Sequence, residues 1–460
     1  MFEKSIEPLY GIKRDLSLDK VLLQSNILPH RYSVSERVDM TMHETYSIDP
    51  DGCQDADDAF SVYFEDSKLY IAIHIADPTE YINIDSALWQ DVEKRVVTRY
   101  PSNKPPIHMM PHQVMEMSSL MVNQYGDIKL AISIVSEIHQ TMYTPIGVVQ
   151  LLFTKIRVKK ENALSYKQAS ELIHINNTIT TCLKLSNSLL ALRSEKTRGT
   201  VLNEVSYSFP KYNEDSMYLY SDTKMEIQMK QMIAEFAIFA NSFVGCYLKI
   251  NFEGSGLYRI CSAKEWLCTI NTEISGKELL NEIIIHGIKA EYISTVEPHD
   301  LIGVAEYTHF TSPIRRLSDC VCHYLLKYIH LKKINTDVPV PFTNDKLKIY
   351  SNDCLKINKK MKNIQYKDIK FRFIQTMHHM LLSTNSIDIC YYIIGYTGLF
   401  LNVIIHKINE HSVYLSYSLR IPDLQTVYPL KEDRYLTVTK VNYMTDYDEG
   451  SIPELDALFI

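Results

Sequence analysis

The segment from Asp49 to Asp58 has the clearest chemical signal in the sequence, because five aspartates fall within ten residues. No lysine or arginine occurs from Val38 to Ser67, so no cation nearby in the sequence can neutralise these carboxylates. Carboxylates packed together repel one another, and the repulsion raises their pKa values. A divalent cation relieves this repulsion, and hard oxygen ligands favour Mg²⁺, Mn²⁺ or Ca²⁺. The segment therefore predicts a metal site.

Two other interpretations of this segment remain open. One is an acidic solvated loop, the commonest fate of aspartate-rich runs. The other is a non-enzymatic domain stabilised by Ca²⁺. The EF-hand pattern fails, because it requires glycine sixth and glutamate twelfth, whereas Gly52 is fourth from Asp49 and Phe60 is twelfth. Asp58 leads directly into a strand-like alternation, and a rigid strand end suits a preorganised metal site better than a mobile loop does.

A second cluster of chemically useful side chains is the segment HFTSPIRR at residues 309–316. Ser312 and Pro313 form a typical helix start, with a serine N-cap and proline at the first helical position, and predict a helix to about Leu331. A helix N-terminus attracts phosphate, and Arg315 in the first turn would add a bidentate contact. The alternative is a plain capped helix with Arg315 in a surface ion pair.

Hydrophobic periodicity predicts the elements that must position these segments. Alternation over 58–77 predicts a β-hairpin, and a second strand-rich stretch covers 128–158. From about 161 to 378 the pattern is mostly helical, with a strong 3.6-residue period over Met225–Tyr247. After residue 385 the alternation returns, which favours a small OB-like β-barrel. We expect an α+β fold in three parts: an N-terminal arm over 1–38, a central domain over 39–382 and a C-terminal β-rich barrel over 383–460.

Composition excludes several classes of protein. The chain has 48 basic and 55 acidic residues, a net charge of −7, so any polyanion site must be a local basic groove. Nine cysteines without a CxxC motif predict reduced thiols rather than disulfides. The N-terminus lacks an apolar signal segment, and the longest uncharged stretch, 389–405, is shorter than the ~20 residues that span a bilayer. We expect an intracellular protein, cytoplasmic or organellar, with no membrane partner.

The best candidate for a basic groove is the segment 356–372, which carries seven lysines and arginines against one acid, Asp368. Lys359 and Lys360 lie at its centre and are our candidate contacts to a polyanion. A solvated helix face is an equally good interpretation, because charge runs are usually just solvated. Three interleaved aromatic side chains could either stack on a ligand or pack in a core: Tyr366, Phe371 and Phe373.

Taken in order, these motifs resemble the ribonuclease II / ribonuclease R family, whose shared catalytic unit is the RNB domain. The family pattern of Ile-Asp followed by Asp-x-Asp-Asp-Ala matches Asp49, Asp55, Asp57, Asp58 and Ala59. Further landmarks follow over about residues 40–335: His74-Ile75-Ala76-Asp77, Arg95 through Thr98 to Tyr100, Met109-Met110-Pro111, Arg198-Gly199, Glu235 to Asn241, Leu257-Tyr258-Arg259 and HFTSPIRR.

The resemblance implies an RNB catalytic domain of mixed sheets surrounded by helices. It implies processive 3′→5′ hydrolysis of single-stranded RNA to nucleoside 5′-monophosphates with Mg²⁺, or with Mn²⁺ in its place. Asp49, Asp55 and Asp58 would hold metal in a two-metal mechanism, and Asp57 would orient or activate the attacking water. Arg315 would hold the phosphates near the scissile bond. The other RNA contacts would be Tyr100 by stacking on a terminal base, Glu235 near the RNA end, and Arg316. If the RNA follows the basic segment, Lys359 and Lys360 would be further contacts, and its aromatic side chains could stack on bases.

Four positions depart from the family pattern as we align it: Asn203 for an aromatic residue, Leu317 for tyrosine, Cys261 for histidine and Asn358 for glutamate. They keep a second hypothesis open, a catalytically silent RNB-type protein that binds RNA or a partner without cutting it. The roughly 40 residues before the aspartates are too few for the cold-shock domains of bacterial members. We therefore expect a compact member with weaker RNA binding and lower processivity.

Overall fold

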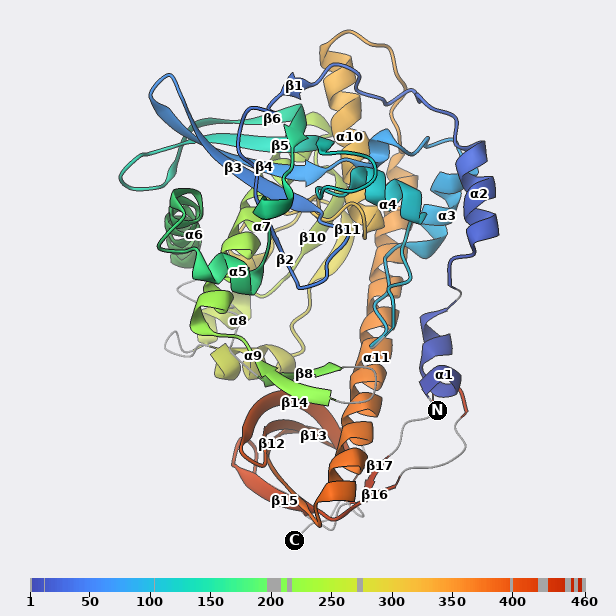
Figure 1. Cartoon of the computed structure of the whole chain (residues 1–460), viewed down its shortest axis with the longest axis vertical. Helices are drawn as coiled ribbons and strands as arrows, with labels where there is room; N and C mark the ends of the chain where they lie inside the picture. Colours follow the sequence, from blue (N-terminus) through green and yellow to red (C-terminus); the bar gives the residue numbers. More distant parts are fainter. Residues whose placement is uncertain are drawn as a thin grey trace.

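The computed structural model describes residues 2–11, 13–102, 104–196, 208–212, 217–270, 276–397, 400–420, 429–442, 448–450 and 454–456. Figure 1 shows an upper body with most of the helices and a β-rich unit below it, and the long helix α11 (Asn344–Ser383) runs from one to the other. The N-terminal residues lie beside the upper body as short helical pieces: α1 (Phe2–Ser5), η1 (Glu7–Tyr10) and α2 (Leu16–Ser25).

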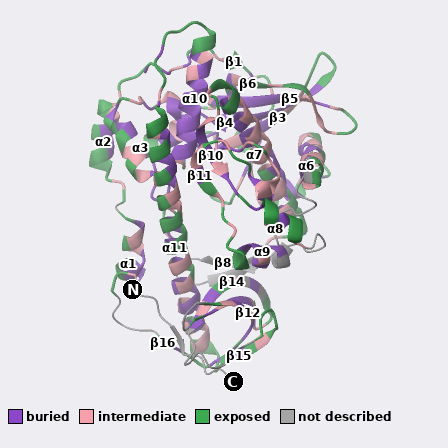
Figure 2. Cartoon of the chain, turned by 180° about the vertical axis from the view of Figure 1, so that it is seen from behind, coloured by how far each residue is buried: buried purple, intermediate pink, exposed green. Residues whose placement is uncertain are grey.

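The upper body is built around a five-stranded sheet in the order β1-β6-β5-β4-β3. Its strands are β1 (Val38–Asp39), β3 (Asp58–Glu65), β4 (Lys68–Ala76), β5 (Ile128–Ile138) and β6 (Pro145–Arg157). The predicted hairpin is confirmed as β3–β4, whose register pairs Asp58 with Ile75. The second predicted stretch is the antiparallel pair β5–β6. Buried residues concentrate on β4, β5 and the neighbouring helix α10 (Leu317–Lys333) (Figure 2).

Helices surround this sheet: α3 (Ala87–Arg95), α4 (His112–Ser118), α5 (Tyr166–Glu171), α6 (Asn177–Lys196), α7 (Lys224–Asn251), α8 (Lys264–Thr269) and α9 (Gly276–Ile285). Helix α7 confirms the helix predicted over Met225–Tyr247, and a capping box between Thr223 and Glu226 starts it. Its length and apolar composition alone would allow it to cross a membrane. Because Met232 and Phe236 are buried in the main core, α7 packs as a core helix.

The helix predicted from Ser312 was wrong in its start, because α10 begins at Leu317. The residues around this start form backbone hydrogen bonds with a segment far away in the sequence. The N–H of Thr98 donates to the carbonyl of Arg315 (3.0 Å), and the N–H of Leu317 donates to the carbonyl of Val96 (2.8 Å). These bonds hold 312–316 in turns against 96–98, so the helical ladder starts only after them. Arg315 therefore precedes the helix rather than lying in its first turn.

The lower unit is a six-stranded sheet in the order β15-β12-β13-β14-β8-β9. Its strands are β8 (Ser208–Tyr212), β9 (Met217–Ser221), β12 (Ile387–Thr397), β13 (Phe400–Ile408), β14 (His411–Arg420) and β15 (Arg434–Val438). One face packs on Phe373 and Met377 of α11. The sheet resembles an OB-like barrel without closing, and the α+β class is confirmed. The domain boundaries at 38 and 382 stay predictions.

Short two-stranded pairs complete the fold: β2 (Ser47–Asp49) with β7 (Ala163–Ser165), β10 (Ser255–Ile260) with β11 (Glu291–Thr295), and β16 (Lys440–Asn442) with β17 (Glu454–Asp456). Three 3₁₀ turns, η2 (Pro78–Glu80), η3 (Lys160–Asn162) and η4 (Asp300–Ile302), link elements. All nine cysteines are free thiols.

Candidate active site

The aspartate segment forms a loop whose two ends are fixed by strands. Asp49 is the last residue of β2, and Asp58 is the first residue of β3. Just outside them, Tyr46 and Phe60 exchange two backbone hydrogen bonds of 2.9 and 2.8 Å. Within the loop, the carbonyl of Asp57 accepts from the N–H of Ala76 at 2.8 Å. The carboxylates therefore stand on a rigid sheet end, which argues against the solvated-loop interpretation.

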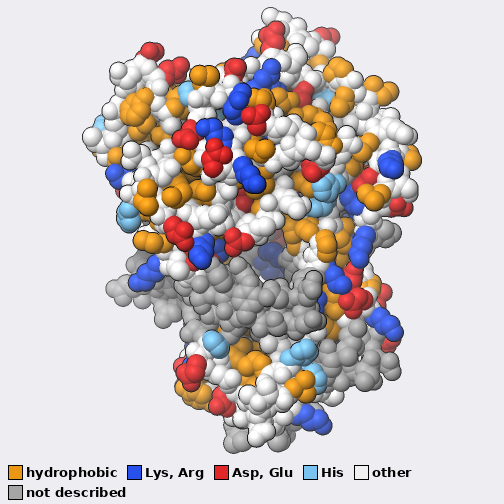
Figure 3. All heavy atoms as spheres, viewed as in Figure 1, with side chains coloured by type: hydrophobic (Ala, Val, Ile, Leu, Met, Phe, Trp, Pro, Cys, Tyr) orange, Lys and Arg blue, Asp and Glu red, His pale blue; other side chains and the backbone are white. Residues whose placement is uncertain are grey.

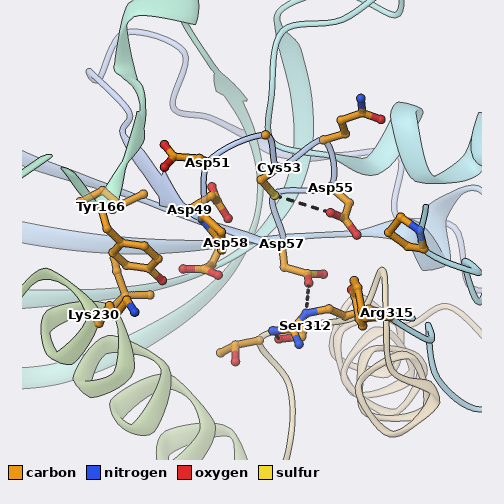
Figure 4. Close-up of a pocket in the computed structure, with 18 of the residues that line it drawn as sticks. Asp49, Asp51, Cys53, Asp55, Asp57, Asp58, Tyr166, Lys230, Ser312 and Arg315 are labelled. Carbon is orange, nitrogen blue, oxygen red and sulfur yellow. Dashed lines mark hydrogen bonds and ion pairs between the residues drawn. The ribbon is translucent and has the colours of Figure 1, made fainter. Parts of the chain in front are cut away.

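The loop lines a cavity of about 880 Å³ that gathers most of the predicted site residues. Asp49, Asp55, Asp57, Asp58, Tyr100 and Arg315 all line it. Figure 4 shows the carboxylates on one side, with Ser312 and Arg315 across from Asp57. The two segments identified in the sequence therefore meet in one site.

Asp57 is the most firmly held carboxylate of the cavity. Its side chain is 4% exposed, and its Oδ1 accepts from the N–H of Ile314 at 2.8 Å. Its Oδ2 accepts from the Nε of Arg315 at 2.9 Å. Burial raises the pKa of Asp57 to about 7, although Arg315 and the Ile314 N–H oppose the rise. Two fixed donors hold this carboxylate in one orientation.

The neighbouring carboxylates have the properties of a cation site. The Oδ2 atoms of Asp49 and Asp55 are buried without a hydrogen-bond partner. Burial, with repulsion from Asp57, raises the pKa of Asp49 to about 7. Burial, with repulsion from Asp49, raises the pKa of Asp58 to about 7. Buried carboxylates that lack donors and repel one another are stabilised by a divalent cation, so this donor set fits Mg²⁺ or Mn²⁺.

The two adjacent arginines of HFTSPIRR have different surroundings. Arg315 is 44% exposed, and besides Asp57 it donates from Nη2 to the Oγ of Ser312 at 2.8 Å. Partial burial lowers the pKa of Arg315, but the neighbouring Asp57 raises it further, so the guanidinium stays charged. Arg316 turns to the buried Asp319, with its Nη2 2.8 Å from Oδ1. The same Oδ1 accepts from the N–H of Ser312 at 2.7 Å, so Asp319 fixes the turn that presents Arg315.

The structure places the other predicted RNA contacts differently. Tyr100 lines the cavity and is 40% exposed, so one part of its ring is open to a ligand. Glu235 lies in a separate cavity of about 510 Å³, where its carboxylate forms a buried ion pair with Arg193. Lys359 and Lys360 are exposed on α11, outside the residues that line the aspartate cavity. On the face in Figure 3, basic and acidic side chains are interspersed over the upper body.

Part of the predicted basic segment has a structural role. Phe371 and Phe373 are 0% and 1% exposed and belong to apolar clusters. Of the two interpretations, stacking on bases or packing in a core, these two side chains therefore follow the second. Arg372 is buried and donates from Nε to the Oγ of Ser102 at 2.9 Å. Asp368 accepts from the hydroxyl of Tyr10 at 2.7 Å. This half of the segment therefore anchors α11 to the body.

The structure describes three of the four positions that depart from the family pattern. Asn203 lies outside the described residues, as do Arg198 and Gly199. Leu317 and Cys261 are fully buried. The side-chain amide of Asn358 donates to the carbonyl of Cys354 at 2.7 Å, within its own helix.

Sequence reasoning missed Lys230 and Tyr166, which line the cavity on the side opposite Arg315 (Figure 4). Lys230 lies on α7. Its Nζ is 2.7 Å from the Oδ2 of Asp222 and 5.7 Å from the centre of the Tyr166 ring. A lysine on the polar side of an amphipathic helix is an ordinary surface residue by pattern alone. Only the fold shows that this lysine lies in the aspartate cavity.

A buried ion network supports the site from behind. Asp77, which directly follows β4, has its Oδ2 2.6 Å from Arg37 and 3.1 Å from Lys327 of α10. Glu80 contacts the same two cations, each at 2.7 Å. The cations hold the pKa of Asp77 well below its usual range against the effect of burial. The network ties the end of β4 to α10, and through them the aspartate loop to Arg315.

Comparison with known proteins agrees with this geometry. A family model described as the RNB domain matches residues 37–332. The human exosome complex exonuclease RRP44 is 28% identical over 366 residues, 70% of this chain and 36% of its own length. Exoribonuclease 2 of Buchnera aphidicola subsp. Schizaphis graminum is 26% identical over 374 residues, 72% of this chain and 55% of its own. The chain thus spans about a third to about half of these relatives.

Two solved structures share the fold. Mycoplasma genitalium RNase R in complex with ribose-methylated single-stranded RNA superimposes with a TM-score of 0.75 at 18% identity, covering 96% of this chain and 76% of that one. Yeast Ssd1, described as a pseudonuclease, superimposes with a TM-score of 0.64 at 17% identity, covering 85% of this chain and 51% of that one. The same architecture therefore occurs in a protein named as a nuclease and in one named as a pseudonuclease.

Proposed function

The chain belongs to the RNB domain family, and from that premise we propose that it is a 3′→5′ exoribonuclease that hydrolyses single-stranded RNA to nucleoside 5′-monophosphates with Mg²⁺. The observation that carries the proposal is the buried Asp57 carboxylate, held by Arg315 and the Ile314 N–H beside partner-less oxygens of Asp49 and Asp55. A site built only for structure would pair such oxygens with donors.

Asp49, Asp55 and Asp58 are the residues that would hold the metal, because each lines the cavity and, within the described part of the chain, none forms an ion pair like that of Asp57 with Arg315. When bound, Mg²⁺ or Mn²⁺ would supply charge stabilisation at the phosphoryl oxygens and a more acidic water, with two ions in the fullest form of this chemistry. Three carboxyl groups with pKa values near 7 make the site costly to ionise without a cation.

The residues of the chain itself would position the RNA. Asp57 keeps lone pairs free of its two donors, which lets it accept a hydrogen bond from the attacking water and fix its direction. Arg315 remains partly exposed to the cavity, and its charged fork can contact a phosphate beside the scissile bond. Tyr100 offers a ring on which a base can stack, a contact worth ~1–3 kcal/mol that tolerates any sequence.

A catalytically silent RNA-binding protein is the second candidate. One observation favours it: the fold is shared with yeast Ssd1, described as a pseudonuclease. Against it, all four aspartates of the family pattern are present here and converge with Arg315 in one cavity. Carboxylates kept close together at the cost of repulsion are hard to explain without a metal-dependent reaction.

The test is a time course on 5′-labelled single-stranded RNA with Mg²⁺, Mn²⁺ or EDTA. We expect a metal-dependent ladder that shortens from the 3′ end, and nucleoside 5′-monophosphate as the product from uniformly labelled RNA. DNA of the same sequence probes the role of the 2′-hydroxyl. RNA that stays full length with every metal, yet still shifts in a binding gel, would favour the silent protein.

A further inference from the structure

A second group of potential metal ligands lies in the lower sheet, far from the aspartates in the sequence. Among the described residues, the only trio whose ligand atoms all lie within 4.8 Å of one another is Cys390, His406 and Asp433. The Sγ of Cys390 lies 3.2 Å from the Nε2 of His406, and the Oδ1 of Asp433 lies 3.0 Å from the same nitrogen. We propose that these three side chains form a zinc site that links β12, β13 and the start of β15.

The backbone arrangement aims these side chains at one point. Cys390 of β12 pairs with Lys407 of β13, but its neighbour Tyr391 pairs with Ile405, so His406 is an extra residue in a β-bulge. A bulge re-aims a side chain and is over-represented beside functional sites. On its other edge Cys390 pairs with Tyr435, two residues after Asp433. Two neighbouring strands and the residue just before a third thus bring a thiol, an imidazole and a carboxylate together.

A Cys-His-Asp catalytic triad does not explain this geometry. A triad uses both ring nitrogens of histidine, one toward the nucleophile and one toward the carboxylate. Here the thiol and the carboxylate both approach Nε2, which has either one lone pair or one hydrogen to offer. A cation between the three ligand atoms can bind all of them at once, so the arrangement favours coordination.

Zinc is the cation that fits this ligand set. Zn²⁺ accepts thiolate, imidazole and carboxylate together, whereas Mg²⁺ and Ca²⁺ prefer oxygen ligands alone. Tetrahedral coordination at ~2.0–2.3 Å places neighbouring ligand atoms roughly 3.3–3.6 Å apart, close to the 3.2 and 3.0 Å observed. Cys390 is buried, His406 is 22% exposed and Asp433 is 58% exposed, so an ion can enter from the Asp433 side and keep a water ligand.

The site lies beside a contact between the lower sheet and the upper body. Tyr392, two residues from Cys390, accepts a hydrogen bond from Asn281 of α9 at 2.7 Å. Lys431, two residues before Asp433, pairs with Glu282 of the same helix. Zinc would therefore fix the segment before β15 that holds the sheet against α9. This site is distinct from the cation site of the aspartate cavity.

Cobalt substitution tests the proposal directly, because a Co²⁺ ion bound by a thiolate gives a sulfur-to-cobalt charge-transfer band that oxygen ligands cannot produce. The full chain is titrated with Co²⁺ in excess Mg²⁺, and Zn²⁺ is then used to displace the cobalt. We expect the band in the wild type and its loss in Cys390→Ser. Asp433→Asn, a change at an exposed position, should weaken binding at least about 10-fold while the chain stays folded.

Two further variants are controls for the loss of the band in Cys390→Ser. Cys268→Ser removes an exposed thiol outside the trio and should leave the band intact. Asp55→Asn alters the aspartate cavity and should also leave it intact. The absence of the band in the folded wild type would overturn the proposal. So would a band that survives Cys390→Ser or disappears in Cys268→Ser.

Discussion

Arg315 and Asp57 are 258 positions apart in the sequence, and the Nε of the arginine donates to the Oδ2 of the aspartate at 2.9 Å. The contact joins the two segments that carry chemistry, the aspartate loop and HFTSPIRR. Arg316, the next residue, pairs instead with Asp319. One arginine thus orients the proposed catalytic carboxylate, and its neighbour holds the turn in place.

Replacing Arg315 by glutamine should lower the single-turnover cleavage rate about 100- to 1,000-fold, the usual cost of removing one preorganised donor. Asp57 would keep only the Ile314 N–H and lose its fixed orientation. The matched control is Arg31→Gln, because the Arg31 side chain is also 44% exposed and also pairs with an aspartate, Asp85. Equal rates in the two variants would contradict the role assigned to Arg315.

Replacing Lys327 by methionine should lower the free energy of unfolding by about 3 kcal/mol or more, because Asp77 and Glu80 would lose a buried cation partner. Urea denaturation measures the change. Lys346→Met is the surface control, since Lys346 is 40% exposed in its ion pair with Glu93 and should cost under about 1 kcal/mol. Similar losses in both variants would show that the buried network does not support the fold.

The buried His74 should make the protein less stable in acid. Burial lowers its pKa from 6.5 to about 3, and its ring contacts the hydroxyls of Ser61 and Ser133 at 3.0 and 2.7 Å. Between these pKa values the unfolded chain binds a proton that the folded chain does not, so stability falls as pH drops from about 6.5 to about 3. The contribution is about 1.4 kcal/mol per pH unit.

His74→Gln should remove that slope from the difference between variant and wild type, as measured by urea denaturation between pH 4 and 6 (on the order of 1.4 kcal/mol per unit). The exposed His112, replaced by glutamine, is the control for the loss of one histidine. An unchanged pH dependence in His74→Gln would mean that His74 is protonated in the folded protein.

Replacing Lys359 and Lys360 together by glutamine tests whether RNA follows α11. If each lysine contacts one phosphate, the slope of log affinity against log salt should become shallower by roughly 1.4. The double variant Lys20→Gln/Lys94→Gln removes two exposed lysines from α2 and α3 and should leave the slope unchanged. Identical slopes in wild type and the Lys359/Lys360 variant would mean that these lysines do not contact RNA and lie on a solvated helix face.

The strands could be predicted from the sequence because alternation is a local property. The hairpin over 58–77 and the strands after residue 385 are present as expected. The start of α10 could not be predicted, because residues far away in the chain decide it: Arg315 and Leu317 bond to Thr98 and Val96. A local Ser-Pro signal has no information about such bonds.

The site shows the same division. Asp57 and Arg315 could be identified by residue type and motif order, yet their direct contact follows only from the fold. Glu235 could be predicted as an RNA contact, but its ion pair with Arg193 places it in another cavity. Lys230 gave no signal at all, since the sequence does not reveal which face of α7 meets the aspartates.

The most direct test of the proposed function compares wild type and Asp57→Asn in single-turnover cleavage of 5′-labelled single-stranded RNA with Mg²⁺. The change removes one negative charge and preserves the shape of the side chain. We predict that cleavage in the variant falls by at least about 100-fold while RNA affinity stays within a few fold, because Asp57 acts on the reacting groups rather than on binding. Cleavage at the wild-type rate in Asp57→Asn would contradict the account.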